Sequence, residues 1–150
     1  MEGEGKAEEI YKYYLKRFEK ILGNKATSSE ELTSLGKKIF GGKYIGTLPR
    51  DLINGNTFSN KKKYVIINNQ TSDKGGEHWV ASAYNDGTIY SYDSYGNNIF
   101  ELIPELRQFN KVVNADRDAE QVGNQENCGA RCMTWLYMFD RYGKEKALLI

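Results

Sequence analysis

Histidine and cysteine are scarce in this chain, which has one His and two Cys among its 150 residues. The two cysteines, Cys128 and Cys132, lie four residues apart in one predicted helix, a spacing that disfavours a disulfide between them. We therefore expect two free thiols and a reducing compartment. A zinc site built from His78 and both cysteines would have only three obvious ligands, so the sequence favours no metal centre.

An excess of one charge sign is also absent, because 21 Lys and Arg balance 20 Asp and Glu to a net charge of +1. No overall field then draws the chain to nucleic acid or anionic lipid, and we interpret the basic run Lys61–Lys63 as a solvated strand entry. No apolar stretch approaches the length of a membrane span, and residues 1–6 are charged and glycine-rich rather than signal-like. We expect a soluble monomer with no membrane partner.

What the chain does contain is 39% apolar residues, enough for the core of a single domain over residues 1–150. Hydrophobic periodicity predicts helices over 7–22, from Ser28 or Ser29 to Phe40, and over 129–142. Short runs rich in β-branched and aromatic residues predict strands at 64–68, 78–84, 88–95 and 111–114. Residues 98–109 favour a helical segment broken near Pro104. The expected fold class is α+β, with a mixed or antiparallel sheet.

The Asp86-Gly87 pair lies between two of the predicted strands and is a strong signal for a two-residue hairpin turn. Counting back from this turn puts His78 and Asp93 on one face of the hairpin as diagonal neighbours, ~7 Å apart at the backbone. A three-residue loop would separate them onto opposite faces. We therefore predict a hydrogen bond between these two side chains.

Cys128 stands at the start of the last predicted helix, where the helix dipole and a free backbone N–H favour a thiolate. His78 would serve as its base, and Asp93 would hold the imidazole in the productive tautomer. Gln121, seven residues before the cysteine, could donate to an oxyanion, with Gln125 as a competitor. Taken together these residues indicate a cysteine protease. Cys132, one turn further on, fits a core position.

Three segments resemble the family of the adenovirus maturation protease, adenain, and its relatives, the SUMO-specific proteases. They are residues 75–79 with the strand that follows, Tyr92–Gly96, and Gln121–Cys132, with a weaker match at Tyr44–Thr47. The resemblance covers about residues 42–140 and has the family's order His, acid, Gln, Cys. Adenain has Glu at the acidic position, whereas relatives often have Asp, as here.

The resemblance implies a papain-like core in which His78 is the base, Asp93 its acidic partner, Gln121 the oxyanion donor and Cys128 the nucleophile. It also implies limited proteolysis of virion precursor proteins, within the virion and the infected cell. No metal or cofactor is expected, although the family leaves room for activation by DNA or a peptide. Family preference for Gly-Gly before the cut makes Gly42 a candidate cleavage site, where the glycines also end a predicted helix.

Three other functions are compatible with the same sequence. A protease acting on ubiquitin-like or SUMO-like modifiers would share the site but need a wider recognition surface. An acetyltransferase of the YopJ type resembles this class in its order of His, acid and Cys and passes acetyl through the cysteine. An inactive capsid-associated binding module is disfavoured because all four site residues are intact.

Overall fold

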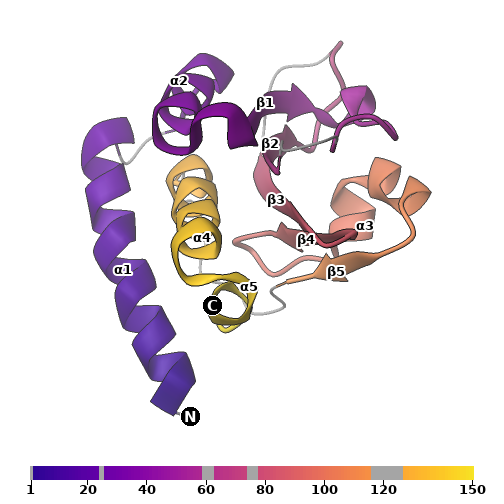
Figure 1. Cartoon of the computed structure of the whole chain (residues 1–150). Coiled ribbons are helices and arrows are strands. Elements are labelled where there is room, and N and C mark those ends of the chain that lie inside the picture. Colours follow the sequence, from indigo (N-terminus) through magenta and orange to yellow (C-terminus); the bar gives the residue numbers. More distant parts are fainter. Residues whose placement is uncertain (1, 24–25, 59–62, 74–77, 116–126) are drawn as a thin grey trace.

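The computed structural model describes residues 2–23, 26–58, 63–73, 78–115 and 127–150. These residues form an α+β fold around a mixed five-stranded sheet (Figure 1). The strands lie in the order β1-β2-β3-β4-β5. Their bounds are Tyr44–Pro49, Tyr64–Asn68, Trp79–Asn85, Thr88–Tyr92 and Val112–Asn114. The outer pairs β1–β2 and β4–β5 are parallel, and the two inner pairs are antiparallel.

Three helices lie on one side of the sheet: α1 (Glu2–Leu22), α2 (Ser29–Phe40) and α4 (Cys128–Tyr142). α4 packs on β3 and lies between the sheet and α1 (Figure 1). α2 begins with a capping box, in which Ser28 and Glu31 each accept a hydrogen bond from the other's backbone N–H. The short helix α5 (Lys144–Ala147) follows α4.

Both faces of the sheet are buried because side chains alternate along each strand. On β2, Tyr64 and Ile66 face the core formed with the three long helices, whereas Val65 and Ile67 face a second core. Helix α3 (Ile99–Leu102) and the 3₁₀ segment η3 (Pro104–Gln108) close the second core. The end of β3 that adjoins His78 is therefore fixed from both sides.

Most predicted elements are confirmed, with shifted ends. The strand predicted at 88–95 stops at Tyr92, and α1 begins at Glu2 rather than at residue 7. Residues 2–6 contain no apolar side chain, so periodicity could not detect that extension. Strand β1 was not predicted, because Gly46 and Pro49 weaken the strand pattern and its parallel partner is not local in the sequence. Within the described ranges, no helix has the length and apolar character needed to cross a bilayer.

Candidate active site

The β3–β4 hairpin places His78 and Asp93 at the same open end of two paired strands. Its turn residues, Asp86 and Gly87, both have positive φ, at +49° and +81°. The strand register is the one predicted from this turn. His78 directly precedes β3, Asp93 directly follows β4, and His78 Nε2 hydrogen-bonds to Asp93 Oδ1. The predicted pairing of the two side chains is confirmed.

Asp93 is fully buried, and both of its carboxylate oxygens are engaged. Oδ1 contacts His78, and Oδ2 accepts a hydrogen bond from the backbone N–H of Asn97 at 2.8 Å. The preceding residue, Tyr92, stacks on Trp135 of α4 with ring centroids 5.4 Å apart. The helix that carries Cys128 therefore also holds the end of the strand that carries the acid.

Cys128 is the first residue of α4 and is 8% exposed. Asn127, at the N-cap position, does not cap the helix with its side chain. Its amide instead donates to Glu19 Oε2 at 3.0 Å and accepts from Arg131 Nε at 3.1 Å. The Asn127 side chain therefore does not accept from the first-turn N–H groups of α4, which lie beside the Cys128 sulfur.

A buried contact around Thr27 joins the sheet to the start of α4. Trp79 Nε1 donates to the Thr27 carbonyl oxygen at 3.2 Å, and the Thr27 side chain lies against Gly129. His78 precedes Trp79 in the chain, and Cys128 precedes Gly129. Through Trp79 and Gly129, Thr27 therefore holds the segment that carries the base close to the segment that carries the thiol.

The surroundings of His78 favour its protonated form. Burial opposes the imidazolium, but hydrogen bonds to Asp93 and Cys128, with the charges of both residues, outweigh burial and raise the pKa of His78 from 6.5 to about 9. Because Nε2 faces Asp93, Nδ1 is the ring nitrogen left for Cys128. An imidazolium beside the thiol at neutral pH is the environment that activates a cysteine nucleophile.

Cys132 differs from Cys128 in its surroundings, although both are free thiols. It is fully buried in the helical core, as its position predicted. Burial, with smaller contributions from the charges of Cys128 and Asp93, raises the pKa of the Cys132 thiol well above its ordinary value. Cys132 is thus an unreactive neighbour of Cys128 on the same helix.

The predicted oxyanion donor Gln121 and its competitor Gln125 lie outside the described ranges. Of the basic run at 61–63, only Lys63 is described. Sequence reasoning missed Thr27 and Asn97, which hold the site through a backbone carbonyl and a backbone N–H. Such contacts leave no signal in side-chain type, so no motif could have revealed them.

A hollow of ≈ 200 Å³ lies beside Trp79, between the ends of β1 and β2 and the start of α2. Thr47, Pro49, Asn68 and Thr71 are among the residues that line it. Trp79 itself belongs to the helical core, as predicted from its alternation with Ala81 and Ala83. Among the described residues, no three His, Cys, Asp or Glu side chains gather as a metal site would require.

Comparison of the chain with protein-family models gives no match, and comparison with curated proteins gives none either. The support for a function therefore comes from the geometry at His78, Asp93 and Cys128.

We predict that Gly129→Ala damages the site, although alanine normally favours a helix interior by ~1 kcal/mol over glycine. A Cβ at this position would lie 2.1 Å from Thr27 Oγ1, so the helix start or Thr27 must move. The expected loss of stability is about 1–3 kcal/mol, as for other overpacked cores. Urea unfolding measures this loss.

The double variant Thr27→Ala, Gly129→Ala is the control, because it removes the clashing oxygen and should recover most of the lost stability. A Gly129→Ala single variant as stable as wild type would contradict the close contact.

Proposed function

We propose that the protein is a cysteine endopeptidase of the adenain-like type, with a papain-like core and Cys128 as its nucleophile. The observation that supports this most is the hydrogen bond between buried Asp93 and His78, near enough to Cys128 at the head of α4 for the cysteine to contribute to the raised pKa of His78. A thiol, a base and an orienting acid in this arrangement are what acyl transfer through cysteine requires.

In the proposed reaction, Cys128 Sγ attacks the carbonyl carbon of the scissile peptide bond and forms a tetrahedral adduct. The adduct oxygen accepts hydrogen bonds from backbone N–H groups at the start of α4, and Gln121 remains our expected second donor. The C–N bond then breaks as the His78 imidazolium gives its proton to the leaving amine, which leaves a thioester on Cys128.

Water completes the cycle. His78, now neutral, takes a proton from a water molecule as the water oxygen attacks the thioester carbon. The C–S bond breaks, the carboxylic acid product leaves, and the thiolate–imidazolium pair is restored. Asp93 holds the imidazole throughout and stabilises the imidazolium.

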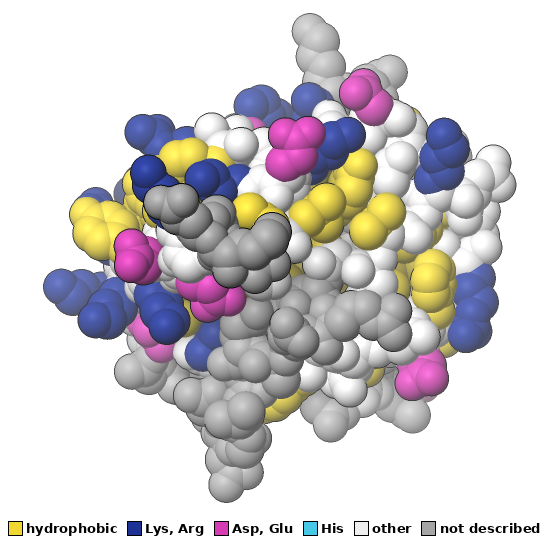
Figure 2. All heavy atoms as spheres, turned by 90° about the horizontal axis from the view of Figure 1, so that it is seen from below, with side chains coloured by type: hydrophobic (Ala, Val, Ile, Leu, Met, Phe, Trp, Pro, Cys, Tyr) yellow, Lys and Arg dark blue, Asp and Glu magenta, His cyan; other side chains and the backbone are white. Residues whose placement is uncertain are grey.

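The substrates we propose are virion precursor proteins cut at sites with glycine beside the scissile bond. Trp79, which directly follows the base in the sequence, lines the hollow described above. This hollow offers space for a substrate side chain. On the face shown in Figure 2, basic and acidic side chains are interspersed among hydrophobic ones, and the net charge of +1 supplies no overall field toward nucleic acid. We propose action as a monomer inside the infected cell and the virion.

A peptide spanning residues 36–46 tests this function with the chain's own sequence. We expect cleavage after Gly42. We expect a Gly41→Val peptide to resist cleavage, because proteases of the adenain type admit only glycine in the narrow substrate groove beside the nucleophile. In the folded protein Gly41 has φ +59° and Phe40 is buried, so this segment is not extended and the intact chain should stay uncut. Mass spectrometry reads each product.

The same assay separates the competing activities. Hydrolysis that needs Cys128 supports the endopeptidase, whereas acetyl transfer to the peptide from added acetyl-CoA, with no hydrolysis, would support an acetyltransferase instead. No turnover of any glycine-containing peptide, with Cys128 no more reactive than Cys132 toward iodoacetamide, would contradict the proposal.

A further inference from the structure

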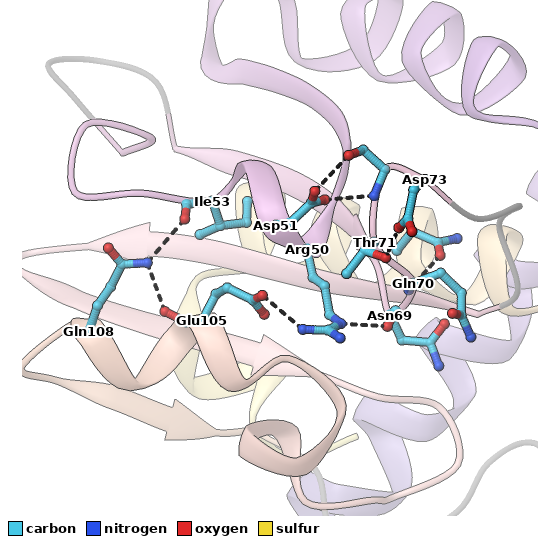
Figure 3. Close-up of polar contacts among 11 residues, drawn as sticks. Arg50, Asp51, Ile53, Asn69, Gln70, Thr71, Asp73, Glu105 and Gln108 are labelled. Atoms are coloured by element: carbon cyan, nitrogen blue, oxygen red, sulfur yellow. Dashed lines mark hydrogen bonds and ion pairs between the residues drawn. The ribbon is translucent and has the colours of Figure 1, made fainter.

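The segment η2 (Arg50–Leu52) holds the backbone that follows β2, and Arg50 makes the contacts with the first two residues of that backbone (Figure 3). Arg50 Nε donates to the carbonyl oxygen of Asn69 at 2.9 Å, and the Arg50 N–H donates to the carbonyl oxygen of Gln70 at 3.2 Å. Arg50 thus fixes the chain just after β2. Because β2 and β3 are antiparallel, this end of β2 lies beside the start of β3.

Asn69 in turn brackets the base. Its backbone N–H donates to the His78 carbonyl oxygen at 3.0 Å, and its side-chain Oδ1 accepts from the His78 N–H at 3.2 Å. Both backbone groups of His78 are therefore held by one residue, whose own carbonyl is held by Arg50. The imidazole must lie close to both Asp93 and Cys128. The two hydrogen bonds from Asn69 fix the position of the His78 backbone, and therefore the position from which the imidazole extends.

The Nη1 end of the Arg50 guanidinium bonds to η3. Arg50 Nη1 lies 2.8 Å from Glu105 Oε2 in η3, and the two side chains are only 28% and 24% exposed. η3 belongs to the segment that follows Asp93. The ion pair therefore links the chain before the base to the chain after the acid, and its partial burial shields it from the screening that weakens surface pairs.

We propose that Arg50 is a positioning residue, which acts through Asn69 to hold His78 at the distance where it contacts Asp93 and Cys128. This inference rests on the proposed function for its catalytic meaning, but its geometric part stands without it. A purely structural role for Arg50 would affect stability alone, whereas positioning must also change the properties of His78 and Cys128.

The sole histidine of the chain makes the test direct, because His78 gives one set of imidazole signals in NMR. We expect Arg50→Met to lower the pKa of His78 from about 9 toward 6.5, because a loosened base loses its hydrogen bonds to Asp93 and Cys128. Removal of a nearby cation would by itself raise the pKa of an imidazole, so a fall identifies positioning rather than charge.

Alkylation of Cys128 by iodoacetamide at pH 7 should slow on the order of tenfold in Arg50→Met, since fewer molecules hold the thiolate–imidazolium pair. The reagent is small, so the rate is independent of how substrate binds. Asn69→Ala removes the side-chain half of the bracket and should move both readouts in the same direction. If Arg50→Met fails to fold, Arg50→Lys keeps the charge but not the planar fork and gives the same readings more weakly.

Lys43→Met is the matched control, because it also removes an ion pair, to Asp140 at 3.1 Å, in a region away from the base. It should leave the His78 titration and the alkylation rate as in wild type. The proposal is overturned if Arg50→Met lowers stability yet matches Lys43→Met in both readouts, or if the pKa of His78 rises. Failure of the proposed function appears separately, in wild-type protein that alkylates rapidly at Cys128 but hydrolyses no peptide.

Discussion

Cys128→Ala is expected to reduce peptide hydrolysis on the order of 10⁴-fold or more, as loss of a covalent nucleophile does elsewhere. The fold should survive, because the change deletes one buried sulfur at the first residue of α4, at a cost of about 1 kcal/mol. Turnover of the residue 36–46 peptide and the midpoint of urea unfolding measure the two effects.

Cys132→Ala is the matched control for that variant. Cys132 lies one turn further along the same helix, is more deeply buried and loses the same atom. We expect it to keep most of the activity while it loses comparable stability. Equal loss of activity in both variants would show that the helix tolerates no cysteine change, and would remove the argument for a nucleophile at 128.

Asp93→Asn should lower turnover by on the order of 10²- to 10⁴-fold while leaving a measurable remainder, because the acid orients and stabilises the base without forming bonds to substrate. The carboxylate is fully buried against His78, so asparagine keeps the shape but not the charge. His78→Ala should be more severely affected. A fully active Asp93→Asn variant would contradict the role of the buried pair.

Asp93→Asn should also change how the stability of the fold depends on pH. The pKa of His78 in the folded protein, about 9, lies above its ordinary 6.5, so protonation of His78 stabilises the fold. That contribution is fully present below about pH 6.5 and is lost as pH rises through about 9. Wild type should therefore exceed Asp93→Asn in stability at pH 6 by more than at pH 10, as measured by urea unfolding at each pH.

The hairpin shows how much of the site could be predicted. The Asp86-Gly87 turn set the parity of the strand register, and this parity alone placed His78 and Asp93 together. Cys128 was placed by its position at a helix start, which is a local property. These features depend on neighbours in the sequence.

The remaining parts of the site depend on contacts between distant segments. The Thr27 side chain lies against Gly129, and Asn69 holds the His78 backbone through its own N–H and its side-chain Oδ1, across 102 and nine positions of the sequence respectively. Arg50 and Glu105 lie 55 residues apart and carry no motif. Strand β1 was missed for a similar reason, since its parallel pairing with β2 cannot be inferred from either strand alone.

The most direct test of the account is an NMR titration of the His78 imidazole in wild type, Cys128→Ala and Asp93→Asn. If Asp93, His78 and Cys128 act as one unit, the wild-type pKa lies near 9 and falls in both variants, because each removes a partner that favours the imidazolium. A wild-type pKa near 6.5 that neither substitution changes would contradict the central claim.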